Sequence, residues 1–167
     1  MNKRIRQYIG LFFAIVMYYI VHEGAHLIYA LVTGVFKQIN FMGLGIQIDV
    51  YADAMTETQL GMFCLVGSIA TIIVAYLLVL MTDRIVKSSS KVFKASMYYI
   101  TVTLLLLDPI YLSVVYRFFG GGDMNGISLS IPEIIAQILY GVLFIINMFL
   151  FWKNILPKYK VAFLNER

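Results

Sequence analysis

Residues 8–32 read YIGLFFAIVMYYIVHEGAHLIYALV, an almost unbroken apolar stretch that contains two histidines and one glutamate. A helix that crosses a bilayer needs about 20 mostly apolar residues, and this stretch is long enough. Basic residues precede it, as in a signal peptide, but it is too long for a signal core and no small-residue cleavage pattern follows. We therefore predict a first membrane span over Tyr8–Val32 that stays in the mature chain.

The composition of the whole chain also indicates a membrane protein. Of its 167 residues, 61% are hydrophobic and only 13% are charged, against about 25% charged in an average soluble domain. The mean hydropathy is +0.85. Further apolar spans are predicted over Leu60–Met81, Ala95–Phe119 and Pro132–Trp152. Because no room remains for a soluble domain, residues 1–167 are predicted to form a single all-α membrane domain with about four transmembrane helices.

The segment between the first two spans has a different character. In Val35–Tyr51, β-branched and aromatic residues alternate with polar residues around Gly43 and Gly45. This alternation predicts a short β-hairpin or strand element. The remaining connections are predicted to be a polar loop, a basic linker and a glycine-rich turn, over Asp49–Gln59, Asp83–Lys94 and Gly120–Gly126.

The net charge of +4 comes from basic residues that cluster outside the apolar spans. One cluster precedes the first span, one joins the second and third, and one follows the fourth. With four spans all three clusters fall on one side, which the positive-inside rule assigns to the cytoplasm together with both termini. The clusters are not interleaved with exposed aromatic residues, so nucleic-acid binding is not expected. The single cysteine, Cys64, excludes an intrachain disulfide and a cysteine-rich zinc site.

The first span contains His22-Glu23-Gly24-Ala25-His26, the His-Glu-x-x-His pattern of zinc hydrolases. Residues four apart share a helix face, so both imidazoles can reach one metal ion. Glu23 projects about 100° round the helix and can face a water in the open metal position. Zinc lowers the pKa of such a water to about 7, and the carboxylate takes its proton. The pattern predicts one zinc ion bound by His22 and His26, with Glu23 as the catalytic base.

The position of the motif strengthens this interpretation. His22 and His26 are the only histidines in the chain. An ionisable group at bilayer depth costs about 2.5–3.5 kcal/mol or more and usually marks a functional site. The competing interpretation is a cluster of hydrogen bonds between helices.

Because the chain has no third histidine, a third zinc ligand is expected to be a carboxylate, or less often an amide or backbone group. The carboxylates in apolar surroundings are Asp108, Asp123 and Glu133. At about 1.5 Å per residue, Asp108 misses the depth of the motif by roughly 5 Å, whereas a straight helix carries Asp123 about 18 Å past it. We therefore rank Asp108 first. Asp123 is the alternative, because the glycine-rich turn can fold it back, and its other interpretation is a solvated turn residue. Glu133 is interpreted as a first-turn residue favoured by the helix dipole.

The stretch HEGAHLIYALVTGVFKQINFMGLGI, residues 22–46, resembles the core of the site-2 protease family of intramembrane metalloproteases. That family typically has His-Glu-x-x-His on a membrane helix, then a glycine pattern and a short strand region rich in Phe and Gly. A later helix carries an aspartate as third ligand, often in Leu-Asp-Gly. The residues that match are His22, Glu23 and His26, then Gly34, Phe41, Gly43 and Gly45, and Leu107-Asp108. Gly67 and Ser68 are similar to a Gly-Pro pattern of the intervening helix.

The resemblance covers Val21–Gly126, and the sequence departs from the family pattern in three features. Pro109 replaces the glycine after the aspartate, and Ser68 stands where a proline is common. Asp123-Met124-Asn125-Gly126 is a second Asp-and-Gly element that can be the true counterpart of the later motif. The family's active site often lies nearer the cytosol, whereas the charge clusters place residues 22–26 in the outer half of the bilayer.

The resemblance implies a zinc metalloendopeptidase whose substrate is a transmembrane segment of another membrane protein. A helical substrate must unwind before hydrolysis, because its carbonyls are hydrogen-bonded and buried. A strand edge within Phe36–Val50 is expected to clamp the unwound segment by strand addition. Asn40, Asn125 and Asn147 are candidate donors to the oxyanion, and the sequence does not rank them.

Three other functions compete with this one. A non-catalytic metal-binding membrane protein or carrier has no need of Glu23 as a base. A zincin similar to the membrane-embedded prenyl-protein proteases usually takes its third ligand from a later glutamate, and Glu133 stands at the start of its span. The weakest alternative is a structural subunit with an accidental motif.

Overall fold

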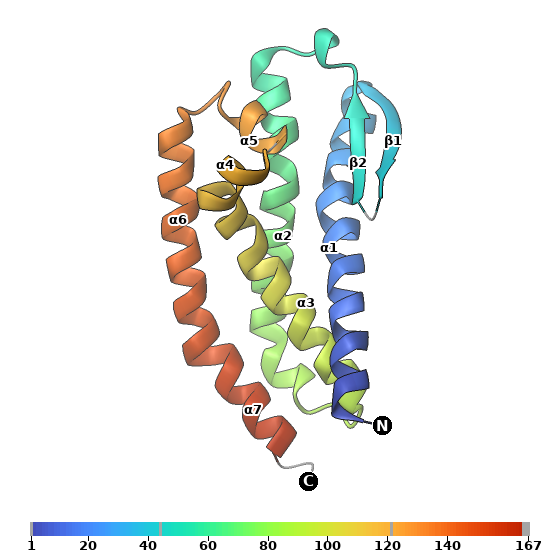
Figure 1. Ribbon diagram of the computed structural model, residues 1–167, viewed down its shortest axis with the longest axis vertical. Helices are drawn as coiled ribbons and strands as arrows, with labels where there is room; N and C mark the ends of the chain where they lie inside the picture. Colours follow the sequence, from blue (N-terminus) through green and yellow to red (C-terminus); the bar gives the residue numbers. More distant parts are fainter. Residues whose placement is uncertain (1, 44, 121, 165–167) are drawn as a thin grey trace.

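A computed structural model describes residues 2–43, 45–120 and 122–164 of the chain. Four long helical stretches lie side by side, and a hairpin packs beside one end of the first (Figure 1). In chain order the elements are α1 (Lys3–Thr33), β1 (Phe36–Met42), β2 (Gly45–Val50), the 3₁₀ turn η1 (Ala52–Ala54), α2 (Glu57–Ile85), α3 (Lys91–Ile110), the π-helical η2 (Tyr111–Val115), α4 (Tyr116–Phe119), α5 (Gly122–Ile127), α6 (Glu133–Leu150), the π-helical η3 (Phe151–Ile155) and α7 (Leu156–Leu164).

Four helical stretches of the described chain are long and apolar enough to cross a membrane. They are Lys3–Thr33, Glu57–Ile85, Lys91–Phe119 and Glu133–Leu164. Their outward apolar side chains are exposed, as at Phe12, Leu80 and Ile145. Such a continuous apolar surface is compatible with a hydrocarbon environment. The predicted fold class, a helical arrangement with about four helices long and apolar enough to cross a membrane and a hairpin after the first, is confirmed.

The helix ends follow local sequence signals. The Asn2 side chain caps α1 at its start, and Gly34 ends α1 in the left-handed conformation at φ 72°. Thr56 and Gln59 form a reciprocal capping box at the start of α2, and Ser90 caps α3. Polar side chains therefore satisfy backbone N–H groups at the starts of α1, α2 and α3, and a glycine ends α1.

The helices are longer than the predicted spans, because hydropathy marks the apolar part of a helix and not its polar turns. The first helix begins at Lys3 instead of Tyr8, and the last stretch continues to Leu164 instead of ending at Trp152. The predicted glycine-rich turn is also partly helical. The chain reverses at Gly120, at φ 76°, and α5 already begins at Gly122.

The hairpin pairs β1 with β2 antiparallel, with Ile39 opposite Ile48 and a left-handed Gly43 in the turn. Lys37 Nζ lies 3.0 Å from Asp49 Oδ2 across the two strands. This hydrogen-bonded ion pair raises the pKa of Lys37 and lowers the pKa of Asp49. The pair ties the strand ends together near α1.

A proline interrupts the third stretch without ending it. Pro109 lacks the N–H that would bond the Leu105 carbonyl four residues earlier. Asn147 of α6 replaces this donor, since its Nδ2 lies 2.7 Å from the Leu105 oxygen, and its Oδ1 accepts a 2.7 Å bond from Tyr76. The helix then continues through the π-helical η2.

Two apolar clusters fill the bundle, one toward the hairpin end and one toward the end that holds both termini (Figure 1). Along α1 the two histidines fall between Ala14 of one cluster and Ala30 of the other. In the third helical stretch, Asp108 likewise falls between Leu105 of α3, in one cluster, and Leu112 of η2, in the other. A buried polar layer therefore separates the two apolar clusters.

Candidate metal centre

The two histidines of the motif point into the bundle from one face of α1. His22 and His26 are both buried, and their Nε2 atoms lie 3.2 Å apart. The rings of Tyr18, His22 and His26 follow one another at four-residue spacing, with centroids 5.1 Å and 4.9 Å apart. The helical repeat of the sequence predicted this shared face.

Asp123 completes a group of three converging side chains. Its Oδ2 lies 3.1 Å from His22 Nε2, and its Oδ1 lies 3.7 Å from His26 Nε2. One ligand atom from each residue lies within 4.8 Å of the other two. The approach of α5 to α2 carries Asp123 there, because Gly126 lies so close to Cys64 that a Cβ would collide with the thiol.

The spacing of these atoms suits a metal ion. Ligands about 2.0–2.2 Å from a tetrahedral zinc ion are about 3.4 Å apart, and the two Nε2 atoms here are 3.2 Å apart. The Asp123 carboxylate presents Oδ2 at 3.1 Å from Nε2 of His22 and Oδ1 at 3.7 Å from Nε2 of His26. Two imidazoles with one carboxylate form a donor set that zinc accepts well. His22, His26 and Asp123 therefore form a group that can hold a metal ion.

Asp108, ranked first from the sequence, contacts the other nitrogen of His22. Its Oδ2 lies 3.3 Å from His22 Nδ1, and it is buried in the polar layer. Tyr18 donates to its Oδ1 at 2.5 Å, and Thr71 donates to its Oδ2. Asp123, the alternative third ligand, therefore lies near the Nε2 atoms of both histidines. Asp108 lies on the Nδ1 side of His22.

The position of Asp108 has a consequence for the protonation of His22. An ionised carboxylate only accepts hydrogen bonds, so it favours the imidazole proton on Nδ1. Nε2 of His22 faces a second carboxylate, that of Asp123, at 3.1 Å. A proton or a metal ion between Nε2 and this carboxylate satisfies both acceptors. Asp108 therefore orients His22 through Nδ1 so that Nε2 points toward Asp123.

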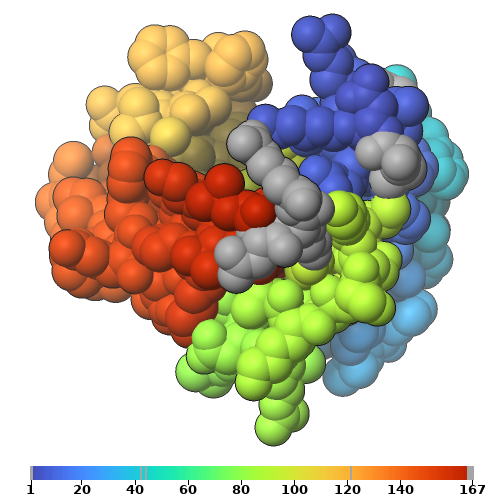
Figure 2. All heavy atoms as spheres, turned by 90° about the horizontal axis from the view of Figure 1, so that it is seen from below, coloured from blue at the N-terminus to red at the C-terminus, as the bar shows by residue number. Residues whose placement is uncertain are grey.

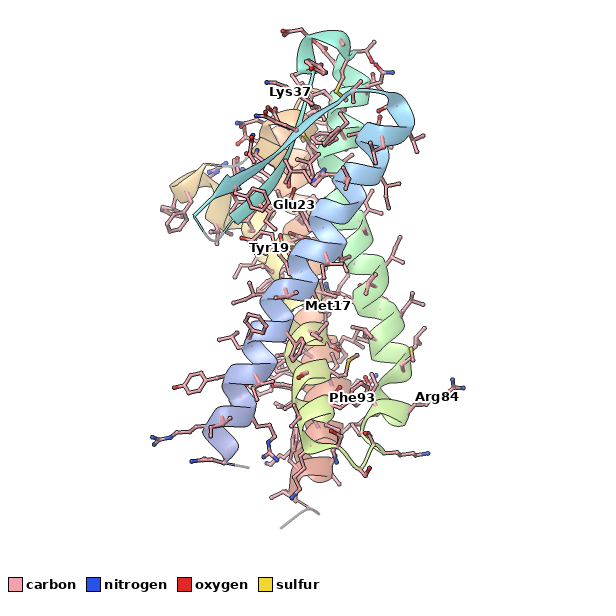
Figure 3. All side chains as sticks on the ribbon, turned by 90° about the vertical axis from the view of Figure 1, so that its right-hand side faces the viewer. Met17, Tyr19, Glu23, Lys37, Arg84 and Phe93 are labelled. Carbon is pink, nitrogen blue, oxygen red and sulfur yellow. The ribbon has the colours of Figure 1, made fainter. Side chains whose placement is uncertain are left out.

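Glu23 points to a different side of α1, as the helical repeat predicted. Its Oε2 accepts a 3.1 Å hydrogen bond from the backbone N–H of Ile48 in β2. Figure 3 shows Glu23 on α1 beside the hairpin. The residue lines a cavity of about 620 Å³ between α1 and the hairpin, whose other walls are mostly apolar and include Phe12, Ile39 and Ile46. Glu23 therefore opens onto an apolar groove, whereas the two histidines are buried inside the bundle.

Gly67 of α2 lies directly against the two imidazoles. A Cβ built there would be 2.5 Å from His26 Nε2 and 2.8 Å from His22 Nε2. In the sequence, Gly67 is distinguished only by its similarity to the glycine of the family's Gly-Pro pattern. Its role here is steric, since only glycine leaves room for both rings beside α2.

Sequence reasoning missed Tyr18 and Thr71, which hold Asp108. Tyr18 lies four residues before His22, so the helical repeat could have revealed it. Thr71 follows Gly67 by four residues on α2, but no local signal in the sequence pairs it with Asp108.

The other candidates have partners away from the ligand group. Asn147 and Asn40 bond Leu105 and Gln38 respectively. Glu133 accepts hydrogen bonds from Tyr116 and Gln137, and Arg117 donates to Gln137 at 2.8 Å. Asn125 is exposed on α5.

No protein-family model, curated protein or solved structure gives a significant match to this chain.

Proposed function

We propose that this chain is an integral membrane zinc metallopeptidase that cleaves within or near transmembrane segments of other membrane proteins. The observation that carries the proposal is the convergence of His22, His26 and Asp123 inside a bundle of apolar helices. Ionisable groups at such depth are costly and usually serve a function. The resemblance of residues 22–46 to the site-2 protease family supports the same reaction.

In this proposal His22, His26 and Asp123 hold one zinc ion, and Asp108 fixes the ring of His22 through Nδ1. When bound, zinc supplies Lewis acidity, which lowers the pKa of a water and polarises a carbonyl. Asp108 acts as a positioning residue, because a carboxylate behind a histidine ligand fixes its tautomer and ring orientation. Tyr18 and Thr71 in turn hold Asp108 in place.

Glu23 is the proposed general base and acid. Its carboxylate takes the proton of the attacking water and returns it to the amine that leaves when the peptide bond breaks. In the resting structure the Ile48 N–H holds one oxygen of this carboxylate at 3.1 Å. That bond orients the carboxylate beside the groove while leaving its second oxygen available to accept a proton.

The hairpin is the proposed substrate clamp. A backbone N–H makes one good hydrogen bond, and the Ile48 N–H donates to Glu23. This N–H therefore points away from β1, the neighbouring strand. The outer edge of β2 therefore faces α1 and the base. An unwound substrate segment that adds to this edge lies next to Glu23, and the apolar groove receives its side chains.

A membrane carrier or other non-catalytic metal binder is the second candidate. The observation that favours it is the engagement of Glu23 by the hairpin, outside the group of metal ligands. Such a protein needs His22, His26 and Asp123 but gains nothing from a base at position 23. The two functions therefore predict different results for one substitution.

The test measures bound zinc per chain in detergent-purified protein after zinc has been supplied. Wild type is expected to hold about one ion, and His22→Ala and Asp123→Ala are expected to lose it. Asp108→Asn is expected to bind zinc about 10–100-fold more weakly, as is typical when a residue that hydrogen-bonds to a metal ligand is changed. Asp53→Asn, which changes an exposed carboxylate outside the group, is the matched control.

Glu23→Gln separates the enzyme from the carrier. It is expected to keep zinc and to lose cleavage of a model transmembrane segment. If Glu23→Gln cleaves as well as wild type, Glu23 is not the base and the peptidase mechanism is wrong. If wild type holds no zinc at all, both proposed functions fail together.

A further inference from the structure

A second cavity lies at the opposite end of the bundle from the hairpin. It has a volume of about 760 Å³ and is lined by α1, α3 and α7. Figure 2 views this end of the molecule, where the blue start of α1, the start of α3 and the red α7 come together. Arg6 on its wall lies 16 residues before His22, roughly 24 Å along α1. The cavity is therefore separate from the candidate metal centre.

Cations from separate elements line this cavity. Lys3 and Arg6 come from α1, and Lys160 comes from α7. None of these three forms an ion pair with any residue that the structure describes. No carboxylate lies on the wall over the described residues. Asp83, an acid of the same end, is paired with Lys158 at 2.7 Å.

The helix ends at this cavity add to the positive potential. Both α1 and α3 begin here, and neither has an acidic residue in its first turn. A helix start carries about half a positive charge and is normally complemented by acidic groups. Lysine and arginine at these helix starts add further positive charge, which a bound anion would compensate.

The remaining walls are aromatic. The Arg6 guanidinium lies 5.2 Å from the centroid of the Phe163 ring, and the rings of Tyr98 and Tyr159 are 5.1 Å apart. Tyr159 is buried, and its hydroxyl has no hydrogen-bond partner among the described residues. The cavity thus combines an apolar aromatic wall with a cationic rim, which suits a ligand that is apolar at one end and anionic at the other.

The cavity also lies at the level where lipid headgroups are expected. Arg6 comes two residues before the apolar stretch that begins at Tyr8, and Lys160 follows the last apolar stretch. Basic pockets between membrane helices on the cytoplasmic side bind anionic headgroups. We propose that this cavity binds the phosphate headgroup of an anionic phospholipid, through Arg6, Lys3 and Lys160. The proposal does not depend on the metallopeptidase function.

The experiment measures the affinity of detergent-purified wild type for phosphatidylglycerol and for phosphatidylcholine by native mass spectrometry. Wild type is expected to bind phosphatidylglycerol preferentially. The double variant Arg6→Gln, Lys160→Gln is expected to lose on the order of 30-fold in this affinity, because each cation near a lipid surface contributes about fivefold. The double variant Arg84→Gln, Lys153→Gln removes the same charge from exposed positions outside the cavity and is expected to bind like wild type.

Two outcomes would overturn the proposal. Equal losses in the two double variants would mean that only the diffuse positive charge of this end attracts lipid. Inorganic phosphate that binds as tightly as phosphatidylglycerol would identify a free anion, and not a lipid, as the occupant. Zinc content, measured on the same samples, keeps a failure here distinct from a failure of the metal centre.

Discussion

Gly67 is the residue on which the geometry of the metal centre depends most directly. Gly67→Ala would place a methyl group 2.5 Å from His26 Nε2 and 2.8 Å from His22 Nε2. At these separations the rings or α2 must shift, because real side chains do not pack so closely. We expect at least about tenfold weaker zinc binding, the lower bound for disturbing the surroundings of a metal ligand.

The control for this substitution lies in the motif itself. A Cβ at Gly24 meets no atom within 4 Å, so Gly24→Ala is expected to bind zinc like wild type. Isothermal titration with zinc measures both variants. Normal zinc affinity in Gly67→Ala would show that the imidazoles do not need the space beside α2.

At the scale of elements, the third helical stretch depends on a bond from α6. Asn147→Leu leaves the Leu105 carbonyl, freed by Pro109, without its donor and leaves Tyr76 without its acceptor. An unsatisfied buried group costs about 1–3 kcal/mol, and side-chain bonds between membrane helices contribute about 0.6 kcal/mol on average. We expect the free energy of unfolding to fall by about 1–3 kcal/mol.

Denaturation in a detergent titration, followed by circular dichroism, measures this change. Tyr76→Phe removes only the Tyr76 bond and is expected to cost less, about 0.6 kcal/mol. If Asn147→Leu unfolds at the same denaturant concentration as wild type, water or a neighbouring donor satisfies the Leu105 carbonyl and Asn147 has no structural role.

At the scale of the whole molecule, the basic clusters predict the orientation of the bundle. The start of α1, the α2–α3 connection and α7 lie at the same end (Figure 1), and the positive-inside rule assigns that end to the cytoplasm. In a Cys64→Ala background, a cysteine at Ser88 is expected to be protected from a membrane-impermeant maleimide in intact cells. A cysteine at Asp53, near the hairpin, is expected to react. The reverse labelling pattern would invert the topology.

The sequence alone determined the helices, the hairpin and the shared face of His22 and His26. Each of these depends on local physics: the length of an apolar run, the alternation of a strand and the repeat of a helix. The helical repeat in the sequence also predicted that Glu23 points away from the helix face that carries the two histidines. These features need no information about which segments meet in space.

Only the tertiary structure decided which carboxylate faces the two Nε2 atoms. Depth counted along straight helices ranked Asp108 above Asp123, but the reversal at Gly120 brings α5 back against α2. Asp108 lies at a suitable depth, yet it approaches His22 from the Nδ1 side. The side from which a residue approaches depends on how whole helices pack, and no local pattern encodes it. For the same reason only the fold revealed the space beside Gly67 and the cationic cavity between α1, α3 and α7.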